Sequence, residues 1–300
     1  MFAPKWPHRV VELAQHLKAG HFDCRGAECS GPRRAWRRIS NGAGSIRLDG
    51  LCYCFPECFE RRLQQRFLEM QAAEIPRPRP PHRVPLGLLM LSRGDLNNTQ
   101  LRQALEAQRQ NGKGRIGEWI QRLGYAREVQ VTGALALQWS CPVIKSLPQR
   151  SYDYMLPLPL LRRFRMVPVK FVSATRVFHI AFAGDIEYRA LLAIEKILDC
   201  KTEVCLTSSA AFESMLEDFE RLSRRNDKTI EGARPSEEMT RIALSYATKL
   251  KAEEIRIVAC GEYIWLRIKD GREFTNLLFE GRKEPRLSET GSVGARATGF

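Results

Sequence analysis

Four cysteines are the residues of this 300-residue sequence whose type and spacing best suit metal chemistry. Four residues separate Cys24 from Cys29, three separate Cys54 from Cys58, and a long loop joins the two pairs. Two such pairs can supply four thiolates to one tetrahedral Zn²⁺ ion. The start of the sequence shows neither a long apolar core nor a small-residue cleavage site, so nothing there indicates export and disulfide formation. The sequence therefore predicts a structural zinc site without catalytic activity.

The second cysteine pair lies in the run YCFPECF, just before a predicted helix. This arrangement is similar to the knuckle-then-helix half of treble-clef zinc modules, in which runs of the type YCSPEC are common; Phe55 here replaces the Ser. Cys52 should point away from Cys54 in an extended segment, so we expect it to be a spare thiol. His21 and Asp23 are weaker ligand candidates. The alternative is that all these cysteines are free thiols, buried in a basic helical domain.

Residues 86–139 contain the same helical pattern twice, at a constant offset that aligns Gly87 with Gly117. Each copy combines a short helix, a turn marked by glycine and a longer helix that begins near Asn97 or Arg127. Six aligned pairs are identical: Gly87 and Gly117, Gly94 and Gly124, Gln100 and Gln130, Ala104 and Ala134, Leu105 and Leu135, and Gln108 and Gln138. This self-similarity indicates an internal duplication of a helical hairpin.

The segments on either side of the duplication predict an α+β protein. Apolar residues at helical spacing flank the cysteines, at 8–20 and at 59–73. After residue 141 the order β-β-α-β-α predicts a small sheet with packed helices, and a helix at 237–250 is followed by paired strands that turn at Cys260–Gly261. The expected organisation is a Cys-rich basic domain at 1–75, a proline-rich linker at 76–85, a domain at 86–224 made of the duplicated unit (86–140) and the β/α part (141–224), a linker at 225–236, a small α/β segment at 237–285 and a disordered tail at 286–300.

The duplicated pattern is Arg-apolar-Gly, then apolar positions, a second Gly and Leu-x3-Leu-x2-Gln. It resembles the N-terminal domain of type II secretion and type IV pilus assembly ATPases. The likeness continues into the run beginning LPLLRRFRMVPVKF, where a β-hairpin leads through a turn at 181–185 into a helix; the family usually has Asp-Pro where this chain has Asp185-Ile186. The segment beginning MTRIALSYATKL further resembles the start of the ATPase region, although this chain lacks the Ser-Asp and the His that the family has there. The resemblance covers roughly Val84 to Phe274.

The chain carries no P-loop. The run G-x4-G-K-[ST] does not occur, and the Gly-Lys pair at 112–113 is followed by Gly and has no Gly five residues earlier. Phosphoryl transfer therefore lacks its usual anchor, and no paired carboxylates or catalytic triad suggest another reaction. We expect a non-catalytic protein that resembles the regulatory N-terminal domain of such an ATPase.

In part of this family the duplicated motif binds cyclic di-GMP, and the residue types suit that ligand. Glycine lets the backbone approach a ligand closely. The guanidinium of Arg presents a planar fork of N–H donors, which can pair with guanine acceptors or stack on the base. The alternative is that these residues only pack helices, in a domain that docks onto a secretion or pilus component. The resemblance implies these ligand residues: Arg115, Ile116, Gly117, Ile120, Gly124, Val131, Leu135 and Gln138 from the second copy, and Leu86, Gly87, Met90, Leu91, Leu101, Leu105 and Gln108 from the first.

Pro85 occupies the position at which the first copy should have its Arg. Proline has no N–H to donate and cannot stack as a cation. Arg83 lies two residues earlier, so its side chain begins about 7 Å away along an extended chain. Losing one Arg fork costs about 1–3 kcal/mol, roughly 5- to 150-fold in affinity. Arg115 is therefore the residue on which nucleotide binding should depend.

The net charge of +14 suits an anionic partner such as a nucleotide, a nucleic acid or a membrane surface. No segment approaches the ~18 consecutive apolar residues that a membrane span requires. We expect a protein that is cytoplasmic or peripheral at the inner membrane and that docks onto secretion or pilus assembly components or their ATPase. The alternative is a zinc-containing nucleic-acid-binding protein, suggested by the basic run GPRRAWRR at 31–38 with Trp36 interleaved.

Overall fold

A computed structural model describes residues 24–27, 29, 45–54, 56–72, 83–112, 114–146, 156–222, 227–232, 234–271 and 273–281. The chain forms two compact units: unit 1 comprises Met1–Ile75, Ile230–Arg272 and Leu277–Phe300, and unit 2 comprises Pro76–Thr229 and Glu273–Asn276. In the described ranges no helix has the length and apolar character needed to cross a membrane. The helix predicted at 8–20, the basic run at 31–38 and the tail predicted at 286–300 lie outside these ranges.

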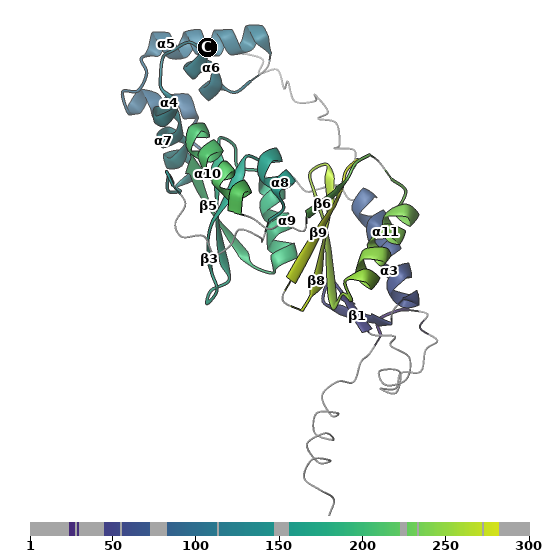
Figure 1. The fold of residues 1–300 in the computed structure, drawn as a ribbon. Helices are drawn as coiled ribbons and strands as arrows, with labels where there is room; N and C mark the ends of the chain where they lie inside the picture. The colour runs from purple at the N-terminus through teal and green to yellow at the C-terminus, as the bar shows by residue number, and fades with distance from the viewer. Residues whose placement is uncertain are drawn as a thin grey trace, which may run out of the picture. The chain divides into compact units, whose positions relative to one another are not determined.

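Unit 1 is organised around a six-stranded sheet with the strand order β2-β1-β7-β8-β9-β6 (Figure 1). Helices α3 (Glu57–Ala72) and α11 (Ser236–Lys249) pack against each other and share one apolar core with the sheet. The strands are β1 (Ser45–Leu48), β2 (Leu51–Cys54), β6 (Asp227–Ile230), β7 (Glu254–Cys260), β8 (Tyr263–Asp270) and β9 (Glu273–Phe279). Most of β6 and the first half of β9 are assigned to unit 2.

The core of unit 1 follows from the apolar spacing of α3. Phe59, Leu63 and Phe67 recur every four residues, lie on one face of the helix and are fully buried. The ring of Phe67 meets that of Phe279 edge-on, with 5.4 Å between the ring centroids. This spacing confirms the helix predicted at 59–73.

The structure differs from the predicted domain organisation in one respect. Strand β1 pairs in parallel with β7, so the segments 1–75 and 237–285 belong to one unit and not to two. The alternate residues Ile46 and Leu48 of β1 are buried against the C-terminal core, and the short hairpin β1–β2 offers no other apolar surface to cover them. Two smaller differences accompany this one: the predicted linker 225–236 contains β6, and β9 is a separate strand after the turn at Gly271.

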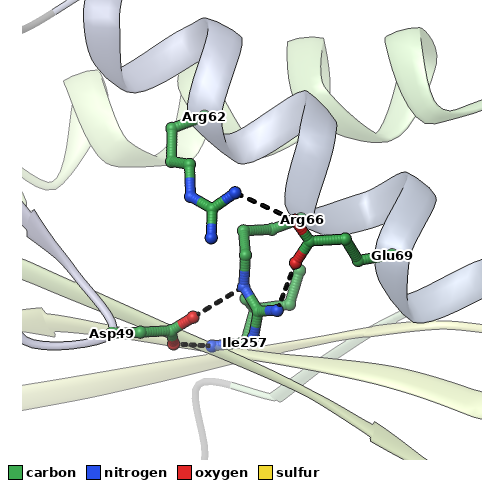
Figure 2. A network of polar contacts seen from close by, with 5 residues as sticks. All are labelled: Asp49, Arg62, Arg66, Glu69 and Ile257. Carbon is green, nitrogen blue, oxygen red and sulfur yellow. Dashed lines mark hydrogen bonds and ion pairs between the residues drawn. The ribbon is translucent and has the colours of Figure 1, made fainter. Parts of the chain in front are cut away.

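Asp49, in the turn between β1 and β2, joins the hairpin to both α3 and β7 (Figure 2). Its carboxylate accepts hydrogen bonds from the backbone N–H of Ile257, at 3.0 Å, and from Nε of Arg66, at 2.8 Å. Arg66 and Arg62 also both donate to Glu69, at 2.6 and 2.9 Å. The network extends the parallel β1–β7 pairing by one side-chain hydrogen bond and anchors α3 over it.

Replacing Asp49 with Ala should destabilise unit 1 by about 1–3 kcal/mol, because the Ile257 N–H and the Arg66 guanidinium both lose an acceptor. Asp49 also has a left-handed backbone, with φ of 49°, which Asn tolerates better than Ala. Asp49→Asn is therefore the matched control and should cost less. Urea unfolding of the three proteins measures the difference; equal stability of Asp49→Ala and wild type would show that the network contributes nothing.

Unit 2 begins with four helices that confirm the predicted duplication (Figure 1). They are α4 (Leu86–Ser92), α5 (Asn98–Asn111), α6 (Ile116–Arg122) and α7 (Glu128–Trp139). Helix α4 packs against α7, and α5 packs against α6. Exchanging the two copies maps each of these contacts onto the other, so the copies are related by an approximate local twofold.

The duplication extends to the hydrogen bonds at the helix starts. Gln100 accepts a hydrogen bond from the backbone N–H of Asn97, and Gln130 accepts one from that of Arg127, both at 2.9 Å. Each glutamine thus closes the first turn of the longer helix in its copy. The identity of Gln100 and Gln130 therefore has a structural reason.

The β/α part of unit 2 has the predicted β-β-α-β-α order, preceded by the short helix α8 (Leu158–Arg163). Strands β3 and β4 are antiparallel, and β4 and β5 are parallel. These elements are β3 (Met166–Val172), β4 (Val177–Ala183), α9 (Tyr188–Leu198), β5 (Lys201–Thr207) and α10 (Ser209–Leu222). Glu128 of α7 accepts a hydrogen bond from the backbone N–H of Ser209, so the duplicated helices and the β/α part are joined within one unit.

Candidate functional sites

The four predicted metal ligands lie together in unit 1. The sulfur atoms of Cys24, Cys29, Cys54 and Cys58 all lie within 4.8 Å of one another, and those of Cys29 and Cys54 are 3.8 Å apart. The loop before β1 supplies the first pair, the end of β2 supplies Cys54 and the first turn of α3 supplies Cys58. Four sulfurs bound at about 2.3 Å to one tetrahedral ion have separations of this size. Cys52 is not part of the cluster.

Backbone geometry around the cluster supports a metal centre. The Cys24 sulfur accepts hydrogen bonds from the backbone N–H groups of Gly26, at 3.4 Å, and Cys54, at 3.3 Å. A Cβ at position 26 would lie 3.1 Å from both Cβ and Sγ of Cys58, so the loop needs a glycine there to pass so close to the helix. Donors aimed at a sulfur stabilise a thiolate, which is the form that binds metal.

The thiol pKa values indicate how a bound cation would favour ionisation of the four cysteines. Burial would raise the pKa of Cys24, but the hydrogen bonds from Gly26, Cys54 and Cys29 lower it. Burial and the neighbouring Cys24 and Cys29 raise the pKa of Cys54 to about 12 and that of Cys58 to about 11. One thiolate therefore opposes ionisation of its neighbours, whereas a divalent ion would reverse that effect. This donor set of four sulfurs suits zinc.

Most of the predicted nucleotide ligands lie in the core of the four-helix unit. A Cβ at Gly87 would lie 2.6 Å from the Leu101 side chain, and one at Gly117 would lie 3.0 Å from Val131 and 3.2 Å from Leu86. The two glycines therefore permit close helix packing at equivalent positions. Met90 and Ile120 are fully buried, and a further group packs partly buried against them: Leu91, Ile116 and Leu135. Leu105 is exposed, and Gly124 is a turn residue with φ of +70°.

The two predicted glutamines connect the copies reciprocally. Gln108 of the first copy donates to the carbonyl of Gly114, at 2.9 Å, and Gln138 of the second donates to that of Val84, at 2.7 Å. Gly114 immediately precedes Arg115, and Val84 immediately precedes Pro85. The glutamines thus fix the two equivalent backbone positions from which a ligand-binding side chain would extend.

Arg115, at the N-cap of α6, reaches out of the four-helix unit and forms an ion pair with Asp185. Both groups remain accessible, with exposed side-chain fractions of 64% for Arg115 and 42% for Asp185. Asp185 lies in the turn between β4 and α9, in the β/α part of the same unit. Asp185 was not among the predicted site residues, although it lies in the turn that resembles the family's Asp-Pro turn.

An exposed arginine fork beside an exposed carboxylate offers donors and acceptors side by side. The fork can donate two parallel hydrogen bonds to a pair of acceptors, and the carboxylate can accept two. Such a pair complements a planar ligand that carries both kinds of group on adjacent edges. This is the chemistry that unit 2 presents at the N-cap of α6.

Comparisons with known proteins agree with the resemblance predicted from the sequence. No protein-family model and no curated protein matches the chain. The solved structure of MshE with cdg (cyclic di-GMP) is 28% identical over 47% of this chain and 100% of its own, with a TM-score of 0.41. Two structures of the N-terminal domain of XpsE are 18% and 19% identical, over 44% and 43% of this chain and 91% and 89% of theirs, with TM-scores of 0.35 and 0.28. MshE and the N-terminal domain of XpsE are thus among the solved structures to which this chain is similar.

Proposed function

We propose that unit 2 is a non-catalytic receptor for cyclic di-GMP, whose binding regulates docking onto secretion or pilus assembly components or their ATPase. The observation that carries the proposal is the accessible Arg115–Asp185 pair at the N-cap of α6. The absence of a P-loop from the sequence supports the non-catalytic part of the proposal.

The pair complements guanine. Guanine presents the acceptors O6 and N7 on one edge, which match an arginine fork, and the donors N1–H and N2–H₂ on the adjacent edge, which match a carboxylate. Adenine has a donor in place of O6 and no N1–H, so it fits neither Arg115 nor Asp185 as well. In this structure the two side chains pair with each other.

The local twofold of the four helices supports a ligand that is itself twofold. Gln108 and Gln138 hold the two equivalent backbone positions by equivalent hydrogen bonds. Cyclic di-GMP consists of two identical halves, so it can meet two equivalent surfaces at once. The net charge of +14 also favours binding of its two phosphates.

Isothermal titration of the full chain with cyclic di-GMP tests this proposal. Arg115→Ala should weaken binding about 5- to 150-fold, since one bidentate contact is lost. Arg122→Ala is the matched control, because Arg122 is equally exposed on the same helix and contacts only Glu118 and the Trp119 ring among the partners recorded for it. Absence of binding at about 100 µM, or equal affinity of Arg115→Ala and wild type, would refute the receptor proposal.

We further propose that the four thiolates of unit 1 hold a structural zinc ion. All four positions of a tetrahedral site are then occupied by protein, so no position is left for water or substrate.

A further inference from the structure

Helix α7 has an exposed apolar face that the duplicated fold does not require. Val129 and Leu137 lie on one face of this helix, eight residues apart, and are 72% and 58% exposed. The offset that aligns the two copies places Thr99 and Ala107 at the equivalent positions of α5. The first copy thus has a polar and a small residue where the second copy has two large apolar ones. Packing of the helical hairpin therefore does not explain the apolar face of α7.

A groove of about 460 Å³ lies along this face. It is lined by Gly133, Ala136 and Leu137 of α7, and by Val143 and Arg93 from other parts of unit 2. Val143 is itself 41% exposed. Apolar side chains that are exposed together around a groove are typical of an interaction site.

The part of the groove that Val143 lines is held in place by main-chain hydrogen bonds. The backbone N–H of Leu206, in β5, donates to the carbonyl of Pro142 at 2.9 Å, and the N–H of Ile144 donates to the carbonyl of Leu206 at 2.7 Å. The segment 142–144 is thereby attached to β5 at the edge of the three-stranded sheet. The groove is therefore formed before a partner binds, which lowers the entropic cost of binding.

Arg93, at the end of α4, brings hydrogen-bond donors into the groove. Its Nε donates to Asp95 at 2.7 Å, and its terminal nitrogens lie over Gly133: a Cβ there would be 3.4 Å from Nη2 and 3.6 Å from Nη1. Neither terminal nitrogen has a hydrogen-bond partner among the described residues. A guanidinium with free donors thus lies between the apolar side chains, where a carboxylate can pair with it.

We propose that this groove docks an amphipathic helix of a partner protein. The partner helix has two apolar side chains seven or eight residues apart, which match the distance of about 12 Å along the helix axis between Val129 and Leu137. Between them it has an Asp or a Glu that pairs with Arg93. Helices of this kind bind to grooves through side chains that recur at helical spacing. The inference rests on the docking part of the proposed function and does not depend on nucleotide binding.

Charge and shape favour this occupant over two others. A second copy that matched Val129 of one protomer with Leu137 of the other would bring two Arg93 guanidinium groups together near the twofold axis, where like charges repel. A bilayer surface would leave the groove unfilled, and one basic residue adds only about fivefold to the binding of an anionic membrane. A helix that carries a carboxylate both fills the groove and meets the free donors.

Selection from a displayed library of helical peptides, with the wild-type full chain as the target, tests the inference. The selected peptides should have two apolar positions seven or eight residues apart, with Asp or Glu between them. Leu137→Ser should weaken their binding about tenfold, because an apolar contact is lost, and Arg93→Gln should weaken it about fivefold, because the ion pair is lost. Leu192→Ser should bind as wild type does; it is the matched control, since Leu192 is an exposed leucine of α9 outside the groove. Thermal unfolding followed by circular dichroism checks that each variant is folded.

The inference is overturned if the library yields no binder, or if Leu137→Ser and Leu192→Ser bind the selected peptides equally well. Sedimentation equilibrium and co-sedimentation with phosphatidylglycerol vesicles measure the other two occupants. A dimer, or vesicle binding, that Leu137→Ser abolishes would assign the groove to a second copy or to a membrane and overturn the helix assignment. Titration with cyclic di-GMP keeps the two proposals apart: if wild type binds the peptides but not the nucleotide, the receptor proposal fails and the docking inference stands, and the opposite result has the opposite meaning.

Discussion

Chelation of the proposed zinc ion should open the β1–β2 hairpin and destabilise unit 1 by more than about 3 kcal/mol, whereas unit 2 should remain folded. The cysteine loop, the end of β2 and the first turn of α3 converge on the four sulfurs, so without an ion the thiol contacts and a few backbone hydrogen bonds are left to hold them together. Strand β1 is also the parallel neighbour of β7. Hydrogen exchange should therefore accelerate after chelation both at β1 and along the edge of β7, although β7 lies far from the cysteines in sequence.

Two substitutions distinguish the effect of losing the metal from the effect of replacing a cysteine. Cys54→Ser should abolish stoichiometric zinc and reproduce the effect of chelation on hydrogen exchange. Cys52→Ser is the matched control, because Cys52 lies in the same strand but outside the sulfur cluster, and it should retain both zinc and protection. Metal retention should also fall as pH is lowered, since protonation of the thiolates competes with the ion. Purified wild-type protein without zinc, or Cys54→Ser with a full complement of zinc, would contradict the metal centre.

Local sequence signals predicted the parts of this structure whose contacts are local. The duplication was predictable because glycine, apolar and glutamine residues recur at one offset, and these residues have local roles in the structure. Gly87 and Gly117 allow close packing, and Gln100 and Gln130 close helix turns. The grouping of the four cysteines was predictable because chemistry limits the residue types and spacings that bind zinc. In both cases spacing along the chain reflects spacing in the fold.

Contacts between distant segments were not predictable in the same way. The residues SIRL of β1 alternate in burial as any short strand does, and nothing in them specifies a parallel partner in the C-terminal part of the chain. The pairing of Arg115 with Asp185 likewise depends on where the turn after β4 lies relative to α6. The sequence also could not show which of the fifteen candidate ligand residues are used in packing, because an apolar residue suits a core and a binding surface equally.

Replacing Pro85 with Arg should raise the affinity for cyclic di-GMP by about 5- to 150-fold, because it adds the second bidentate fork. The backbone already has the required form. The carbonyl of Pro85 accepts hydrogen bonds from the N–H groups of the residues three and four positions later, at 3.0 and 3.2 Å, and the carbonyl of Arg115 does the same at the same two distances. The two N-cap residues have similar ψ, 138° at Pro85 and 156° at Arg115, while φ is −54° at Pro85 and −98° at Arg115. An Arg at 85 therefore starts from the same N-cap position as Arg115, with the same carbonyl hydrogen bonds.

The control Pro85→Ala distinguishes the effect of adding the Arg donors from the effect of removing the proline ring. Removing proline loosens the unfolded chain and lowers stability by less than about 1 kcal/mol in either variant, but only Arg adds donors. Titration of both variants should therefore show tighter binding for Pro85→Arg alone. Equal affinities of Pro85→Arg and Pro85→Ala would mean that the first copy does not contact a base, and that the local twofold of the helices serves packing rather than recognition.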